Sequence, residues 1–160
     1  MVSKQIVVQY KQRSEGKMKS SLAALMAINK VQQTLLQRMT KQHHLTVSEW
    51  QLLDHIGGGE NTQEILAQQT KLDTSTLSRQ LKGLVAKDMV TKKAIGRDKR
   101  QLVYTITDNG TETAATINTA FETLSDDVFE HWSTDERNLL QILLNRLDKS
   151  MDRQRTVKEP

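Results

Sequence analysis

The feature that most constrains this chain is its lack of helix-breaking residues. A single proline, Pro160, stands at the last position, and only seven glycines occur in 160 residues. Folds built from many short strands use proline and glycine at their turns, so this scarcity favours long helices. Apolar residues also recur every three or four positions in several stretches, which places them on one side of a helix. We therefore expect one mainly helical domain with a small β component.

Composition excludes several classes of protein. The chain has no cysteine, which rules out disulfides, thiolate metal sites, cysteine nucleophiles and thiol redox sensing. No apolar run approaches 18 residues, and the first ten residues lack the apolar segment of a signal peptide. No set of residues resembles a catalytic acid, base or nucleophile. These observations predict a cytoplasmic protein that does not bind membranes and is not an enzyme.

Capping signals and apolar spacing predict the order of the elements. Thr46 and Glu49 form a capping box, Asp73 and Asp108 are expected N-caps, and Ser133 begins a second box. The expected elements begin with a helix over 17–43, one from Thr46 that stops at Gly57, a short one through 65–67 and one over 74–87. Strands over 89–95 and 100–107 follow, and then helices over 108–131 and from Ser133 to Met151. The charged tail from Asp152 is expected to fray. Two short helices, a tight turn and a hairpin in this order are typical of a winged helix-turn-helix.

Positive charge gathers in the same region. Residues 71–100 contain nine basic and three acidic residues, a net charge of +6, whereas the rest of the chain has a net charge of −2. A basic stripe on a mildly acidic body is expected of a protein that binds nucleic acid. A lysine-rich solvated face is the alternative interpretation.

The helix over 74–87 is expected to enter the major groove of double-stranded DNA. At about 100° per residue, its inward face is the apolar set Leu77, Leu81, Leu84 and Val85. Gly83 and Ala86 are expected on or beside the outward face. Arg79 can bond a guanine edge through two hydrogen bonds, small hydroxyls allow close approach, and the first backbone N–H groups suit a phosphate. The residues expected to contact DNA here are Thr74, Ser75, Thr76, Ser78, Arg79 and Lys82. Alternatively, the hydroxyls only cap the helix and the two cations are solvated.

Three stretches resemble the MarR (multiple-antibiotic-resistance regulator) family of bacterial transcription regulators. They are TVSEWQLL at 46–53, LDTSTLSRQLKGLVAKDMV at 72–90 and DKRQLVYTITDNG at 98–110. The last is the most specific, because it matches the family's wing signature of Asp-x-Arg and an alternating strand. The resemblance implies a homodimer in which residues 45–107 form the DNA-binding lobe, and residues 1–44 and 108–160 form the helical dimerisation region.

The resemblance also implies roles for the wing. Asp98 and Arg100 match the family's wing pair, in which the arginine enters the minor groove and the aspartate orients it. Arg97 and Lys99 are further candidates, whereas an ordinary turn salt bridge is the alternative for the pair. Lys92 and Lys93 would contact phosphates or remain solvated.

Many members of this family bind a small aromatic acid. The candidates for such an effector site are Tyr10, His43 and Trp50, although a tryptophan at this position is more often core. No cofactor is expected. No metal site is expected either, because His43 and His44 point about 100° apart on a helix. The predicted function is a homodimeric transcriptional regulator, a repressor, on a pseudo-palindromic operator. The alternative is a protein-interaction module built on a winged helix that does not bind DNA.

Overall fold

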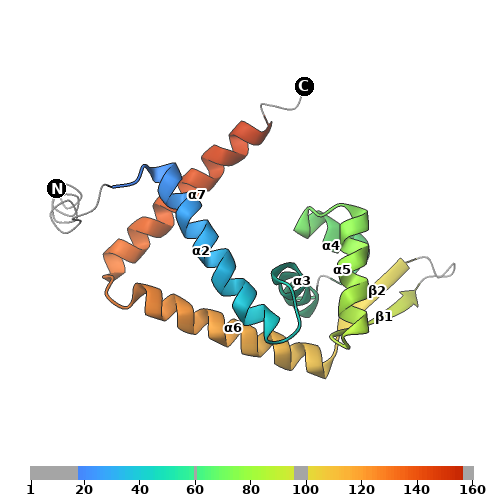
Figure 1. Ribbon diagram of the computed structural model, residues 1–160. Helices are drawn as coiled ribbons and strands as arrows, with labels where there is room; N and C mark the ends of the chain where they lie inside the picture. The colour runs from blue at the N-terminus through green and yellow to red at the C-terminus, as the bar shows by residue number, and fades with distance from the viewer. Residues whose placement is uncertain (1–17, 60, 96–100, 157–160) are drawn as a thin grey trace. The chain divides into compact units, whose positions relative to one another are not determined.

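The computed structural model describes residues 18–59, 61–95 and 101–156. The described elements are α2 (Ser21–Lys41), α3 (Val47–Gly57), α4 (Gln63–Thr70), α5 (Thr74–Ala86), β1 (Val90–Ile95), β2 (Gln101–Ile106), α6 (Asp108–Phe129) and α7 (Thr134–Thr156) (Figure 1). This order confirms the expected mainly helical fold with a winged helix-turn-helix.

Most helix starts follow the predicted capping signals. The Thr46–Glu49 box opens α3, since the Glu49 N–H donates to Thr46 Oγ1 at 3.1 Å and the Thr46 N–H donates to Glu49 Oε2 at 2.8 Å. Ser133 and Glu136 form the corresponding box before α7. The prediction for the first long helix was too long, because α2 begins at Ser21 after the N-cap Ser20. Short polar side chains at an N-cap satisfy backbone N–H groups that have no partner within the helix.

The start of α6 differs from the prediction. Thr107, not Asp108, acts as its N-cap, because Thr107 Oγ1 accepts from the Gly110 N–H at 2.9 Å, and Asp108 is already helical. The Thr107 hydroxyl also donates to the Asp88 carbonyl at 2.8 Å. A Cβ on Gly110 would lie 2.1 Å from the carbonyl oxygen of Met89. The first turn of α6 therefore needs glycine to pass this close to the backbone that precedes β1.

The described chain divides into two compact units, Met1–Thr111 and Glu112–Pro160. Within the first unit, α3, α4 and α5 pack around a core of leucines (Figure 1). The fully buried side chains of this core are Leu52, Leu53, Leu66, Leu77, Leu81 and Leu84. This core holds α5 in place and leaves its other side available.

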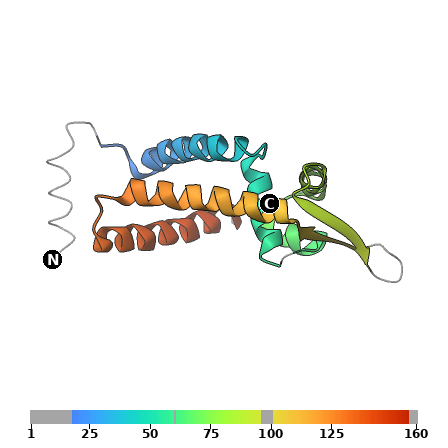
Figure 2. The ribbon, with the colours of Figure 1, turned by 90° about the horizontal axis from the view of Figure 1, so that it is seen from below.

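The wing is an antiparallel hairpin of β1 and β2, with Val90 opposite Ile106 and Lys92 opposite Tyr104. It is attached to the helices by the segment before α4, since the Tyr104 N–H donates to the Asn61 carbonyl at 2.8 Å. Tyr104 is buried, whereas every residue of β1 after Val90 is exposed. Figure 2 shows the two strands extending outward from the helices of this unit.

In the second unit, burial decreases along the apolar seam of α6. Ile117 is fully buried, Phe121 is half-buried and Val128 is exposed. The turn into α7 is held by an edge-to-face contact between Phe129 and Trp132, with ring centroids 5.3 Å apart. Contrary to the prediction of a frayed tail, α7 continues to Thr156. Residues 152–156 include neither proline nor glycine, so the helix is not interrupted there.

Candidate nucleic-acid interface

Helix α5 separates an apolar face from a polar and cationic face. Leu77, Leu81 and Leu84 have no exposed surface, as the spacing predicts, and Val85 is half-buried. The exposed residues on the opposite side are Thr74, Ser75, Ser78, Arg79 and Lys82, while Thr76 is half-buried. Within the described part of the chain, neither Arg79 nor Lys82 forms an ion pair. Both cations are therefore available to an external anion.

The N-terminus of α5 is organised by the carboxylate of Asp73. It accepts the Thr76 N–H at 2.9 Å, the Ser75 hydroxyl at 2.5 Å and the Thr76 hydroxyl at 2.7 Å. The hydrogen bonds from Ser75 and Thr76 hold the pKa of Asp73 well below its usual range. The expected N-cap is confirmed, and the phosphate contact expected at the N–H groups near Thr74 and Ser75 stays a prediction. The Asp73 carboxylate already accepts from the Thr76 N–H, and its charge opposes an anion beside it.

Ser78 connects the two helices of the helix-turn-helix. Its Oγ accepts from Nε2 of Gln63, the first residue of α4, at 2.8 Å. This contact was not predicted, because nothing in the local sequence links two residues that lie 15 positions apart. Ser78 therefore links α5 to α4. It is also exposed, so the contact with DNA expected from the sequence stays a prediction.

Gly83 does not belong to the outward face, which corrects the prediction. A Cβ at this position would lie 2.7 Å from Oε1 of Glu49 in α3. Glu49 is buried, and both of its carboxylate oxygens accept from Lys87 Nζ at 2.7 Å. Because Gly83 has no side chain, the Glu49 carboxylate of α3 has room beside the C-terminal end of α5.

Two opposing effects set the pKa of Glu49. Burial raises it, but the hydrogen bonds from Lys87 and Thr46 outweigh burial, and the pKa is lowered overall. The carboxylate therefore stays charged and joins three chain segments. The capping box predicted only its local contact with Thr46; the longer-range contact with Lys87 had no local signal.

The described part of the wing carries two exposed cations on adjacent positions of β1. Lys92 lies opposite Tyr104 and Lys93 opposite Val103, so their side chains leave the hairpin on different faces. The predicted wing-tip contacts, Arg97, Asp98, Lys99 and Arg100, lie outside the described residues.

The three effector candidates are not brought together. Tyr10 lies outside the described residues, His43 is half-buried and Trp50 is buried. Trp50 lines a pocket of about 350 Å³ between α3 and the end of α4, together with His55 and Leu72, and His43 does not line it. The positions of His43 and Trp50 therefore do not support one shared site.

Neither a metal site nor a membrane span is found in the described ranges. No three histidine or acidic side chains there lie close enough together to hold a metal ion. Over the same ranges, no helix combines the length and apolar character needed to cross a bilayer.

Parts of this chain are similar to known transcription regulators. Residues 43–101 match the model of the MarR family. The HTH-type transcriptional regulator YxaD of Bacillus subtilis (strain 168) is 33% identical over 85 residues, which cover 53% of this chain and 59% of that relative. The match thus spans about three fifths of the relative's length.

Solved structures show the same fold at lower identity. Staphylococcus aureus MarR in complex with salicylate and kanamycin has a TM-score of 0.74 and 19% identity, over 82% of this chain and 90% of that one. A mutant MarR from E. coli complexed with operator DNA has a TM-score of 0.67 and 21% identity, over 78% and 91%. The B. subtilis relative is a transcriptional regulator, and the E. coli protein was solved with operator DNA. The predicted resemblance is thereby confirmed: residues 43–101 match the MarR family model, and the chain has the same fold as these solved MarR proteins.

Proposed function

We propose that this chain is a sequence-specific, DNA-binding transcriptional repressor that inserts α5 into the major groove. The observation that carries the proposal is the face of α5 formed by Ser75, Arg79 and Lys82, which is exposed while the opposite leucines are fully buried. A helix held rigidly from behind, with hydroxyls and cations in front, has the chemistry of a recognition helix. Two proteins with the same fold were solved with DNA.

The cations divide into two roles in this proposal. Arg79 reads a guanine edge, because a guanidinium can donate two parallel hydrogen bonds to O6 and N7. Lys82, Lys92 and Lys93 neutralise phosphates without reading sequence. At the wing tip, Arg100 enters a minor groove and Asp98 orients it, with Arg97 and Lys99 as further contacts.

The proposed protein is a homodimer. In α2, Leu22, Met26 and Val31 are each more than half exposed in the single chain. In α7, Leu143 and Met151 are each 51% exposed. Apolar surface of this extent on long helices is typical of an interface. A second copy with twofold symmetry would cover it, and this symmetry predicts a pseudo-palindromic operator with half-sites about 10 bp apart.

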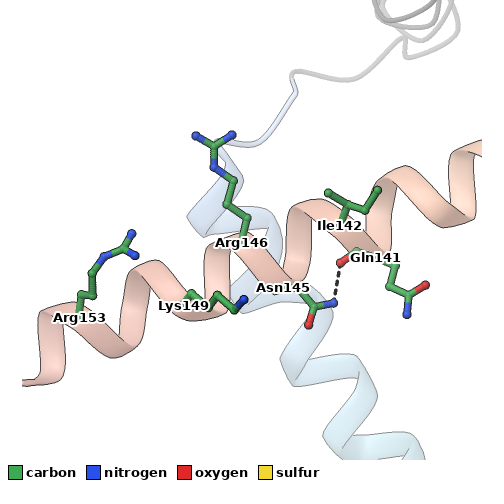
Figure 3. A pocket seen from close by; sticks show the side chains of 6 residues that line it. All are labelled: Gln141, Ile142, Asn145, Arg146, Lys149 and Arg153. Atoms are coloured by element: carbon green, nitrogen blue, oxygen red, sulfur yellow. Dashed lines mark hydrogen bonds between the residues drawn. The ribbon is translucent and has the colours of Figure 1, made fainter.

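Figure 3 shows that the neighbouring surface of α7 has a different character. Ile142 is the single apolar side chain among the six drawn, which all belong to this helix and otherwise are polar or basic. The Asn145 side-chain amide donates to the Gln141 carbonyl at 2.8 Å, so this donor already has a partner within α7. Apolar contacts of α7 with a second copy would therefore centre on its leucines, with these polar residues at the rim.

A small aromatic effector would release the repressor from DNA. The pocket beside Trp50 supports this part of the proposal, since an indole wall suits an aromatic ring. The similar S. aureus MarR was solved with salicylate and kanamycin. Tyr10, outside the described residues, stays a candidate for this site, whereas His43 does not line the pocket.

Binding to a random-sequence duplex across a salt series tests the core of the proposal. If each dimer neutralises about 6–10 phosphates, log affinity falls against log salt with a slope near −5 to −9. Sedimentation of the free protein over the same concentrations gives the oligomeric state. No duplex binding at 50 mM salt would overturn the proposal and favour the protein-interaction module.

A further inference from the structure

Two hydroxyl groups at the start of α5 have a defined direction of hydrogen bonding. Ser75 Oγ and Thr76 Oγ1 lie 2.5 Å and 2.7 Å from different oxygens of the Asp73 carboxylate. The same hydrogen bonds hold the pKa of Asp73 far below neutrality, so the carboxylate is ionised and can only accept. Both hydroxyl protons therefore point to Asp73.

These bonds exceed what helix capping requires. The cap itself is the bond from the Thr76 N–H to Asp73 Oδ1 at 2.9 Å. The Ser75 hydroxyl adds nothing to the satisfaction of helix N–H groups, because it is a side-chain donor. What the contact does is orient the serine. With its only proton engaged, Ser75 Oγ can offer just its lone pairs to another molecule.

Ser78 provides the opposite case on the same face. Its Oγ accepts from Gln63 Nε2 at 2.8 Å, and its own proton remains available to an outside acceptor. Ser75 and Ser78 are both exposed. Two serines on one helix surface thus present different chemistry to a ligand.

The edges of the bases distinguish these roles. In the major groove, adenine N6 and cytosine N4 are donors, whereas guanine O6 and N7 and thymine O4 are acceptors. Phosphate oxygens also only accept. An oxygen without a free proton therefore matches an amino group and matches neither a phosphate nor a carbonyl edge.

We propose that Asp73 is a positioning residue that makes Ser75 an obligate hydrogen-bond acceptor, so that Ser75 selects adenine or cytosine beside the base read by Arg79. This inference rests on the proposed function, because it requires α5 to lie in the major groove. Arg79 lies four residues after Ser75 and hence on the same side of the helix. Each half-site should therefore contain an amino-bearing base next to a guanine.

Selection of bound duplexes from a random pool tests this directly, using the full chain and three variants. The Ser75→Ala variant identifies the position that Ser75 reads, since only there should the preference fall, by about tenfold. The wild type should require adenine or cytosine at that position. The Asp73→Asn variant keeps a good N-cap but offers an amide donor, which frees Ser75 to donate and should admit guanine or thymine. Ser78→Ala removes a second exposed serine of the same face; any change should fall at another position, and the preference at the Ser75 position should stay as in the wild type.

A second measurement does not depend on the Asp73 variant. Replacing the selected adenine by purine, or the cytosine by 2-pyrimidinone, removes only the amino group. The wild type should lose about tenfold in affinity, and Ser75→Ala should lose nothing further.

The outcomes separate the inference from the function on which it rests. A wild-type preference for guanine or thymine at the Ser75 position, no altered position in Ser75→Ala, or an unchanged preference in Asp73→Asn would overturn the inference alone. A pool that the wild type fails to enrich in any sequence would overturn sequence-specific DNA binding itself, and the inference with it.

Discussion

Helices α5 and α7 are both amphipathic, but they bury their apolar faces to very different extents. In α5, Leu77, Leu81 and Leu84 are fully buried by the rest of the first unit. In α7, Leu143, Leu144 and Met151 are between 45% and 51% exposed. The comparison shows that the apolar face of α5 is covered within one chain and its polar face is exposed, whereas the apolar face of α7 is left exposed, as the proposed dimer requires.

The largest expected effect tests the buried side of this comparison. Leu81→Ala removes a fully buried side chain from α5 and leaves a cavity, so we expect a loss of about 3 kcal/mol in the free energy of unfolding. Chemical denaturation at several protein concentrations measures it. Because the cavity lies within one chain, the loss should not depend on protein concentration. A loss below about 1 kcal/mol would contradict the packing described for α5.

The exposed side of the comparison is tested by Leu143→Glu in α7. If a second copy covers this leucine, two new charges enter the interface of each dimer, and association should weaken by about 2–3 kcal/mol. Sedimentation over a concentration series measures this. Gln141→Glu adds the same charge at an exposed polar position of the same helix and is the control. Equal dissociation constants for the two variants would show that Leu143 is not at the interface.

The contact that joins α3 to the end of α5 should have a somewhat smaller effect. Glu49→Gln keeps the shape of a buried side chain but removes the charge that pairs with Lys87, which is 32% exposed. Partial exposure of the lysine reduces the effect, and we expect a loss of about 2 kcal/mol at pH 7.

The stabilisation that the Glu49 charge provides should depend on pH. The pKa of Glu49 is lowered in the folded state, so its contribution is complete above the unfolded value near 4.5. The contribution disappears as pH falls through the folded pKa. The stability difference between wild type and Glu49→Gln should therefore shrink below pH 4.5. A difference that stays constant between pH 7 and pH 3 would exclude this role of the charge.

The smallest expected effect is on DNA binding, and it compares a residue on the outward face of α5 with one in the wing. Arg79→Ala should lower discrimination between operator and scrambled duplex by about 1.5 kcal/mol, because a bidentate contact to one base is lost. Lys92→Ala, the matched control, should weaken both duplexes alike and reduce the salt slope by about one. Competitive binding at two salt concentrations measures both. The division of roles fails if both variants weaken the two duplexes equally.

The sequence predicted much of the candidate DNA-binding face of α5, because the signals that place its residues are local. The spacing of Leu77, Leu81 and Leu84 places Arg79 and Lys82 on the opposite side of α5, and Asp73 begins the helix as expected. The direction of the Ser75 hydroxyl could not be predicted, because an Asp-x-Ser sequence allows several rotamers. Gly83 was misplaced for a related reason, since its neighbour is a side chain from another helix.

Most helix starts, the apolar face of each helix and the region of positive charge could be read from the sequence alone. Caps such as Thr46 and Asp73 act within one turn, and periodicity repeats every few residues, so both can be read without tertiary contacts. Contacts between distant positions depend on how the chain packs. They are Glu49 with Lys87, 38 positions apart, Gln63 with Ser78, and Thr107 with Asp88 at the start of α6. Hydrogen-bond partners are chosen by distances of about 3 Å, which only the packed chain establishes.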